Sequence, residues 1–210
     1  MSEHARIQHT TTSGTFNLDG GSWDVENNVW LVGNDTECAV IDAPHQLEPI
    51  LQLIGDRKLT AVLCTHAHDD HVTAARQVSE ATGAPVRLHP ADEVLWRQLH
   101  PEFDFVPLAD GELIQVAGIS LQARHTPGHS PGGVCFYGAA LGAVFSGDTL
   151  FKGGPGATGR SFSSFGTLLD TIRYQLFTLP VETVVHTGHG ESTSIGEEVP
   201  HLDEWIARGH

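Results

Sequence analysis

Short runs of apolar and β-branched residues alternate along this chain with segments in which apolar residues recur every three or four positions. The first pattern is typical of strands and the second of helices, so their alternation favours a layered α/β protein. Several of the strand-like runs are apolar throughout, which is typical of strands covered on both faces. The expected strands are Asn28–Gly33, Glu37–Asp42, Leu59–Thr65, Val86–His89, Glu112–Val116, Ile119–His125, Gly133–Tyr137, Ala143–Ser146 and Thr183–Thr187.

Four segments have the apolar spacing of a helix that places one face against a sheet. They are Leu47–Ile54, Ala75–Thr82, Phe165–Leu176 and Ile195–Ile206. No Ser/Gly linker or short repeat divides the chain, so we expect one domain over residues 1–210. The Gly-rich stretch Phe151–Ser161 is expected to form a loop beside a site.

Charge and cysteine content restrict the classes of partner. The chain has 11 Lys and Arg against 26 Asp and Glu, a formal net charge of −15. Nucleic acids and anionic membranes attract clustered basic side chains, so neither is an expected partner. The three cysteines lie in strand-like runs, which indicates small hydrophobes rather than a disulfide framework. Without a signal-like N-terminal segment or an apolar run of about 18 residues, we expect a cytoplasmic protein.

The most specific feature is the run Thr65-His66-Ala67-His68-Asp69-Asp70-His71, which follows an apolar strand. Side chains alternate in extended chain, so His66, His68 and Asp70 can point to one side. His71 falls on the first turn of the following helix. Strand-to-helix junctions are common places for sites in α/β sheets. Asp69 is interpreted only as an acid that favours a helix N-terminus.

Three further donors follow glycines at other expected strand ends. They are His129 in HTPGHS (125–130), Asp148 in SGDTLF (146–151) and His189 in TGHG (187–190). Glycine lets the backbone turn sharply and brings the next side chain close to an ion. His125 and His186 are interpreted as neighbours of the site or strand residues, and the histidines outside these motifs as structural or surface residues.

With THAHDDH (65–71), HTPGHS, SGDTLF and TGHG in this order, the sequence resembles the metallo-β-lactamase superfamily. Within it, the motifs resemble the glyoxalase II (hydroxyacylglutathione hydrolase) type. The resemblance implies a four-layer αββα sandwich with a metal site at one edge. It also implies a short form of that type, because little chain follows His189 and the helical C-terminal domain of long glyoxalase II enzymes is not expected.

Carrying the family's ligands over by motif position gives two metal sites. The first comprises His66, His68 and His129, the second comprises Asp70, His71 and His189, and Asp148 bridges them. Imidazole and carboxylate ligands suit zinc, and iron and manganese also accept them. The expected cofactors are therefore two divalent metal ions, zinc first.

Two such ions roughly 3.5–4 Å apart lower the pKa of a bound water to near 7, so a metal-bridging hydroxide is the expected nucleophile. Asp70 is expected to orient it and is the catalytic residue assigned here. The motifs show no separate acid, and a thiol of pKa about 8.5 leaves without one. The expected reaction is therefore hydrolysis of a thioester, with a small acyl-thiol as the substrate.

Substrate contacts are expected in the segment after Asp148. Asp148 is the only acidic residue between Leu113 and Leu169, whereas the basic residues Arg124, Lys152 and Arg160 lie in the same span. One interpretation is a neutral-to-positive rim that admits an anionic substrate, and the other is that buried strands lack acids. Glyoxalase II enzymes have a Gly-Arg or Gly-Lys step before an aromatic residue here, which Gly159 to Phe162 resembles. The expected contacts are Lys152, Arg160 and Phe162.

Other functions are also compatible with these motifs. A persulfide dioxygenase shares the THxHxDH region but uses a single iron held by a facial triad, here His66, His129 and Asp148. A lactonase is a further enzyme alternative. A metal-binding module without catalysis is the least favoured.

Overall fold

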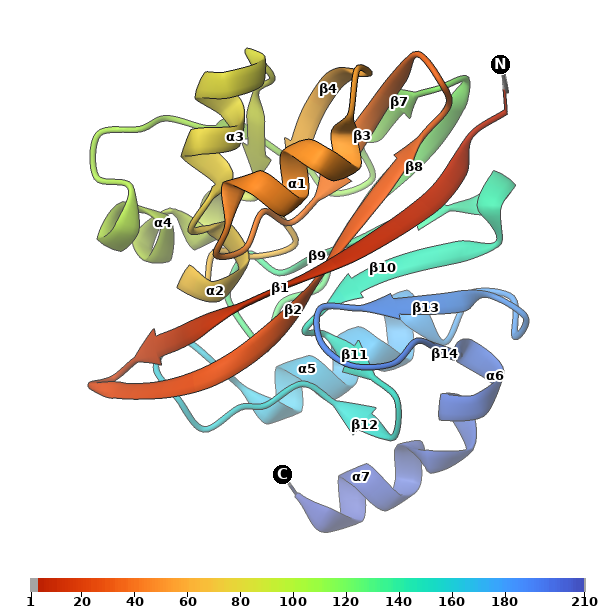
Figure 1. Ribbon diagram of the computed structural model, residues 1–210. Helices are drawn as coiled ribbons and strands as arrows, with labels where there is room; N and C mark the ends of the chain where they lie inside the picture. The colour runs from red at the N-terminus through yellow and green to blue at the C-terminus, as the bar shows by residue number, and fades with distance from the viewer. Residues whose placement is uncertain (1–3, 210) are drawn as a thin grey trace.

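The structure is a computed structural model that describes residues 4–209, and two six-stranded sheets form its centre (Figure 1). The first sheet is antiparallel from β1 to β3 and parallel from β3 to β6. Its strands, in spatial order, are β1 (Arg6–Leu18), β2 (Gly21–Gly33), β3 (Glu37–Ile41), β4 (Lys58–Leu63), β5 (Val86–Leu88) and β6 (Val106–Pro107).

The second sheet pairs β10 with β13 in parallel, and its other neighbouring strands are antiparallel. In spatial order it contains β14 (Thr193–Ser194), β13 (Val184–Thr187), β10 (Ala143–Gly147), β9 (Val134–Gly138), β8 (Ile119–His125) and β7 (Leu113–Val116). A short separate ladder joins β11 (Leu150–Phe151) to β12 (Gly154–Pro155).

Helices lie outside both sheets, so the predicted four-layer αββα sandwich is confirmed (Figure 1). The first sheet is accompanied by α1 (Leu47–Ile54), α2 (Asp69–Val72), α3 (Ala75–Thr82), η1 (Pro90–Asp92) and α4 (Glu93–Leu99). The second is accompanied by α5 (Phe165–Thr171), η3 (Ile172–Leu176), α6 (Ile195–Glu198), η4 (Val199–His201) and α7 (Leu202–Arg208). A short turn, η2 (Ala139–Leu141), connects β9 to β10.

The alternation of side chains along the central strands explains why their sequences are apolar throughout. In β3, Cys38 and Val40 pack with the helices, whereas Ala39 and Ile41 pack between the two sheets. Strand β9 shows the same division, because Cys135 faces the second helical layer and its neighbours face the first sheet. Each central strand therefore contributes to two of the three buried layers.

The largest difference from the sequence prediction is the β1–β2 hairpin. Its register runs from Arg6 opposite Gly33 to Leu18 opposite Gly21. Asp19 and Gly20 both have positive φ, 53° and 78°, as a two-residue turn that matches the strand twist requires. The prediction covered only Asn28–Gly33, and the Asp-Gly pair was the signal that could have found the rest.

Two predicted helices differ in regularity. The segment Ile195–Ile206 is divided into α6, η4 and α7 at Pro200, which lacks a backbone N–H and restricts the preceding residue. The segment Phe165–Leu176 is continuous, but its second half, η3, has the wider π-helical winding. The predicted loop Phe151–Ser161 contributes to the β11–β12 ladder.

Two further observations concern the expectations from composition. Cys38, Cys64 and Cys135 are buried and carry free thiols. Among the described residues 4–209, no helix combines the length and the apolar character that crossing a bilayer requires.

Candidate metal centre

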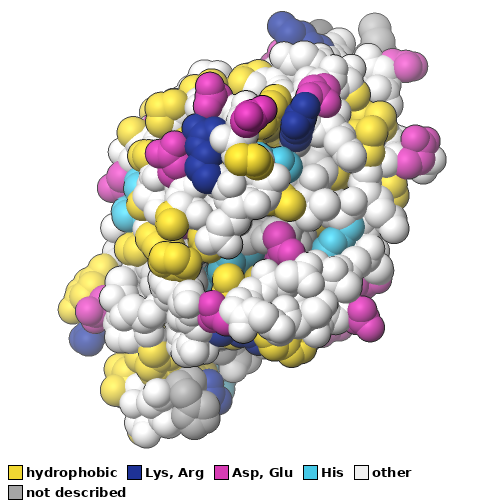
Figure 2. Space-filling view, turned by 90° about the vertical axis from the view of Figure 1, so that its left-hand side faces the viewer, with side chains coloured by type: hydrophobic (Ala, Val, Ile, Leu, Met, Phe, Trp, Pro, Cys, Tyr) yellow, Lys and Arg dark blue, Asp and Glu magenta, His cyan; other side chains and the backbone are white. Residues whose placement is uncertain are grey.

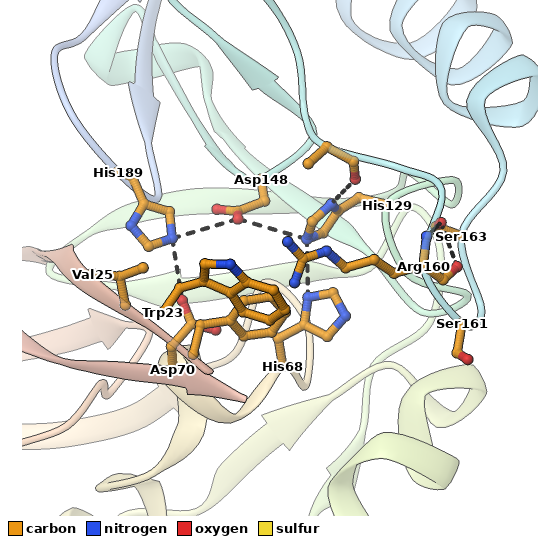
Figure 3. Close-up of a pocket in the computed structure, with 12 residues that line it drawn as sticks. Trp23, Val25, His68, Asp70, His129, Asp148, Arg160, Ser161, Ser163 and His189 are labelled. Carbon is orange, nitrogen blue, oxygen red and sulfur yellow. Dashed lines mark hydrogen bonds and ion pairs between the residues drawn. The ribbon is translucent and has the colours of Figure 1, made fainter. Parts of the chain in front are cut away.

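The seven donors singled out in the sequence lie on the segments that follow four strand ends, with Asp70 and His71 on α2, and they meet at one edge of the sandwich. Figure 3 shows five of them, His68, Asp70, His129, Asp148 and His189. The segments follow β4, β8, β10 and β13. Backbone hydrogen bonds join them, because Val134 N donates to Thr65 O at 2.7 Å and Gly188 N donates to Gly147 O at 2.8 Å. Residues far apart in the sequence are therefore held together by the backbone itself.

The first cluster consists of three buried histidine rings. Nδ1 of His68 lies 3.0 Å from Nε2 of His66 and 2.9 Å from Nε2 of His129. One ring nitrogen of each residue lies within 4.8 Å of those of the other two. The three nitrogens thus face one small space.

The second cluster is formed by Asp70, His71 and His189. Nε2 of His189 lies 3.2 Å from Oδ2 of Asp70 and 3.2 Å from Nε2 of His71. Asp148 lies between the two clusters, with Oδ1 3.2 Å from His71 Nε2 and Oδ2 3.6 Å from His129 Nε2. Its carboxylate is in position to contact ligands in both clusters.

Backbone carbonyls orient two of these rings. Nδ1 of His129 donates to Ala157 O at 2.7 Å, and Nδ1 of His189 donates to Glu26 O at 2.7 Å. A carbonyl only accepts, so Nδ1 of each ring carries a proton, and a metal ion would bind at Nε2. Nε2 of both rings faces the cluster.

The buried carboxylate of Asp42 orients two more rings. Nδ1 of His71 donates to its Oδ2 at 2.8 Å. The hydroxyl of Thr65 also donates to Oδ2, at 2.8 Å, and in turn lies 3.0 Å from Nδ1 of His66. Because the hydroxyl proton is directed to Asp42, Thr65 accepts from His66, and Nε2 of His66 is left with its lone pair.

This donor set fits divalent metal ions. Imidazole nitrogens and carboxylate oxygens converge on a small space, while the remote ring nitrogens of His71, His129 and His189 are hydrogen bonded, as they are in metal-binding histidines. Among the described residues, three groups with metal-binding spacing occur, and all belong to these two clusters. Together they comprise His66, His68, Asp70, His71, His129, Asp148 and His189.

Electrostatics differ between the two clusters. Burial, reinforced by the neighbouring rings, lowers the pKa of His66 well below its ordinary value and that of His68 to about 3. These two rings are therefore neutral at physiological pH, which is the protonation state that binds a metal ion.

The second cluster holds charge. Burial alone would lower the pKa of His71 and His189, but the carboxylates of Asp148 and Asp70 outweigh it and raise both, that of His189 to about 10. Burial alone would raise the pKa of Asp148, but His71 and His189 hold it well below its usual range. A cation bound here would displace protons from the two rings.

Glycines allow the close approach of the loops. A Cβ on Gly188 would lie 2.2 Å from Oδ1 of Asp148 and 2.7 Å from Cε1 of His71. Gly147 has φ of +50°, and a Cβ there would lie 2.4 Å from the Thr65 hydroxyl. The glycine before a donor is therefore required by space at both positions.

A cavity of about 230 Å³ opens over the donors (Figure 3). Its apolar wall comes from Phe16, Trp23 and Val25 on the β1–β2 hairpin. Arg160 lies on the opposite loop, with Cζ 3.8 Å from the centre of a Trp23 ring. Its Nη1 is buried without a hydrogen-bond partner among the described residues.

In the space-filling view of Figure 2, acidic side chains are spread over the face shown and basic side chains are fewer.

The other two residues expected to contact substrate lie outside this cavity. Lys152 is exposed and pairs with Glu191 at 2.6 Å. Phe162 is also exposed and lines a separate depression together with residues of the β1–β2 turn. Of the basic side chains in the acid-poor span, Arg124 packs on Tyr137 and donates to Gln175 O, so Arg160 alone lines the cavity.

Sequence reasoning missed a buried asparagine beside the second cluster. Nδ2 of Asn27 donates to Oδ2 of Asp70 at 3.0 Å, and its Oδ1 lies 2.7 Å from Nε2 of His45. His45 was interpreted as a structural or surface residue, and it orients this amide. The one available signal was a polar pair, Asn27 and Asn28, at the start of an apolar run.

Comparisons with known proteins agree with this architecture. Residues 23–189 match the family described as the metallo-beta-lactamase superfamily. The chain is 35% identical over 188 residues to the probable metallo-hydrolase YqgX of Bacillus subtilis, a match that covers 81% of this chain and 88% of the relative. It is 32% identical over 192 residues to hydroxyacylglutathione hydrolase GloC of Haemophilus influenzae, covering 84% and 86%.

A solved structure shows the same fold. The crystal structure of TTHA1623 in a di-iron-bound form superimposes with a TM-score of 0.75 at 34% sequence identity. The match covers 83% of this chain and 93% of that one.

Proposed function

The chain belongs to the metallo-beta-lactamase superfamily, and from that premise we propose that it is a metal-dependent hydrolase with two divalent ions and an acyl-thiol substrate. The observation that carries the proposal is the convergence of seven imidazole and carboxylate donors in two adjoining clusters at the floor of a cavity. The superfamily consists largely of metal-dependent hydrolases, which agrees with the names of both curated relatives.

The proposed ligands follow the two clusters. His66, His68 and His129 hold one ion, Asp70, His71 and His189 hold the other, and Asp148 contacts both. Zinc suits this mixture of donors, and iron and manganese are also compatible. The di-iron form of the similar TTHA1623 supports two ions in this fold and keeps iron among the candidates.

When bound, two divalent ions supply a water ionised near neutral pH and a Lewis acid for the substrate carbonyl. The protein residues orient the reactants. Asp70 accepts a hydrogen bond from the attacking water, and Asn27 fixes the Asp70 carboxylate by donating to Oδ2. The hairpin side chains Phe16 and Trp23 cover one side of the cavity and exclude bulk water.

A thioester is the favoured substrate because of the leaving group. A thiol of pKa about 8.5 departs as thiolate, whereas an amine or alcohol needs a proton from a positioned acid. The relative GloC is named as a hydrolase of an acylated glutathione, which supports this substrate class and the glyoxalase II type. Arg160 is proposed to bind an anionic group of the substrate, because it lines the cavity and its Nη1 has no hydrogen-bond partner among the described residues.

A single-iron persulfide dioxygenase is the second candidate. Its three ligands are available, since His129 Nε2 lies 3.6 Å from Asp148 Oδ2 and His66 belongs to groups with both residues. That function leaves the second cluster without a role, so the dinuclear hydrolase explains more of the arrangement.

The test is elemental analysis of the purified chain combined with assays on thioesters, lactones and glutathione persulfide. Two metal ions per chain and thioester hydrolysis that is lost in His68→Ala are expected. Arg173→Ala, an exposed substitution outside the cavity, serves as the control and should retain activity. One iron per chain with oxygen uptake on the persulfide would establish the second candidate instead.

A further inference from the structure

A buried carboxylate outside every motif connects the two loops that carry the first cluster. Asp92 ends η1 and is fully buried. Its Oδ2 accepts from Ala67 N at 2.9 Å and from Ser130 Oγ at 2.8 Å, and its Oδ1 accepts from Gly132 N. No lysine or arginine pairs with it among the described residues. All three partners are neutral donors.

The partners lie directly beside the three histidines. Ala67 separates His66 from His68, and Ser130 follows His129. The backbone bond from Val134 N to Thr65 O joins the same two loops only at their base. Asp92 therefore acts where the rings are attached, and sets the position of two ligands on one loop relative to the third on the other.

The close approach at this point depends on a glycine. A Cβ on Gly132 would lie 2.6 Å from the backbone N of Asp92 and 2.8 Å from its Cγ. The loop can reach the carboxylate only because no side chain is present there.

From these contacts we infer that Asp92 is a positioning residue for the first metal ion. It holds the two loops that carry His66, His68 and His129 at a fixed separation before the ion binds. This inference rests on the proposed function, because it assumes that the first cluster binds a metal ion. Removal of such hydrogen-bonding support around metal ligands typically weakens metal binding by 10–100-fold.

The chain provides a matched control outside the first cluster. Glu198 is also a buried carboxylate that joins two segments, since it accepts from Gly153 N at 3.0 Å and from Thr193 Oγ1 at 2.6 Å. Its hydrogen bonds go to the turn between β11 and β12 and to β14, and not to the loops that carry His66, His68 and His129. Glu198→Ala therefore imposes a comparable structural loss without touching the first cluster.

The experiment measures Zn²⁺ affinity by competition with a chromophoric chelator in a His189→Ala background, where the second cluster lacks a ligand. We expect Asp92→Ala to weaken the remaining site by about 10–100-fold. Asp92→Asn is expected to weaken Zn²⁺ binding less than Asp92→Ala does, because the amide oxygen still accepts hydrogen bonds. Some weakening remains, because the NH2 group replaces an acceptor and faces another donor. Glu198→Ala should bind Zn²⁺ like the background variant. In the Co²⁺-substituted protein, only the Asp92 variants should change the ligand-field bands.

The outcomes separate the two proposals. If the background variant and the unmodified chain bind no Zn²⁺, the proposed function fails. If both bind and the Asp92 variants match Glu198→Ala in affinity and spectrum, Asp92 is only structural and the inference is overturned. Should Asp92→Ala fail to fold, Asp92→Asn and Gly132→Ala replace it in the comparison with Glu198→Ala. In Gly132→Ala the carboxylate of Asp92 is intact, and the added methyl group displaces the loop from it.

Discussion

At the scale of single residues, the imidazole donors of the candidate metal centre are oriented by the ring nitrogens that point away from it. His129, His189 and His71 each use Nδ1 to bind a carbonyl or carboxylate, which leaves Nε2 for an ion. His68 is the exception, because its Nδ1 faces the other rings and its Nε2 has no partner among the described residues. The ring nitrogen that each histidine presents to the cluster depends on its neighbours in the folded chain, and residue type alone does not determine it.

Arg160 leads to a prediction about substrate binding. Arg160→Ala should raise KM for an anionic acyl-thiol by roughly tenfold or more with a smaller change in kcat, because a hydrogen bond to a charged group contributes about 1.5–3 kcal/mol. Arg160→Lys keeps the positive charge but loses the planar guanidinium group, so its KM should lie between those of the unmodified protein and Arg160→Ala. Steady-state kinetics on matched anionic and neutral thioesters provide the measurement. Equal effects on both substrates would contradict the anion role.

His186 leads to a prediction about acid stability. Its ring packs against Trp30 and Phe145, with ring centroids 4.2 Å and 5.3 Å away, and burial lowers its pKa from 6.5 to about 4. In the unfolded chain His186 therefore binds a proton near pH 6.5, whereas in the folded chain it does so only near pH 4. This contribution to stability is complete above pH 6.5 and is lost as the pH falls toward 4.

His186→Phe removes that proton uptake. In metal-free protein, the wild type should lose on the order of 1–2 kcal/mol more unfolding free energy than the variant between pH 7 and 4, a value reduced for partial solvent exposure. Urea unfolding at several pH values measures the difference. Parallel pH profiles for the two proteins would show that His186 makes no such contribution.

At the scale of elements, the β1–β2 hairpin forms the cover of the site. Its turn is held from two sides, because Asp19 accepts from Ser161 N at 2.9 Å and Asn17 N donates to Asp69 at 3.0 Å. Asp69, which the sequence placed only at a helix N-terminus, therefore also anchors the hairpin. The strands place Phe16 and Trp23 over the cavity and against the Arg160 guanidinium.

Trp23 leads to a prediction about this cover. Trp23→Ala removes the surface on which Arg160 lies and should raise KM for the anionic substrate, with a KM effect smaller than that of Arg160→Ala because the charge is retained. A cation–π contact of this kind contributes roughly 0.5–2 kcal/mol. If Trp23→Ala adds its full effect in an Arg160→Ala background, the two side chains act independently and this explanation is wrong.

At the scale of the whole molecule, metal binding is expected to stabilise the fold. The two clusters join loops from both sheets, so ions that bind only the folded chain shift the unfolding equilibrium. At a free ion concentration of 100 times Kd, each site contributes about 2.7 kcal/mol. For a chain of this size, that corresponds to roughly 5–10 °C in Tm per site.

Thermal unfolding with and without a chelator measures this effect. The chelated protein should unfold at lower temperature, and added Zn²⁺ should restore the original Tm. Asp148→Asn retains the size of the side chain and removes the negative charge shared by the two clusters. It should reduce the difference in Tm between the chelated and the Zn²⁺-loaded protein. An identical Tm in the presence and absence of chelator would contradict metal binding at these loops.

Much of the molecule was accessible from sequence because it depends on local patterns. The apolar runs predicted most central strands, and the spacing of Leu47–Ile54 predicted α1 with its observed bounds. The long β1–β2 hairpin was largely missed, because β1 has an edge position and its Thr-rich sequence lacks an apolar run. Its pairing with β2 is a non-local property that periodicity does not report.

The sequence by itself determined a layered α/β protein and singled out seven donors at four strand ends, since both depend on residue type and short spacing, whereas the four-layer αββα order came from the family resemblance of its motifs. Only the tertiary structure decided the distances within the two clusters, that Arg160 rather than Lys152 or Phe162 lines the cavity, and that Asn27 and Asp92 hydrogen bond to the segments that carry the donors. The physical reason is that these contacts join loops from separate strands. Their distances depend on how the two sheets pack and on how the glycine turns bring the loops together.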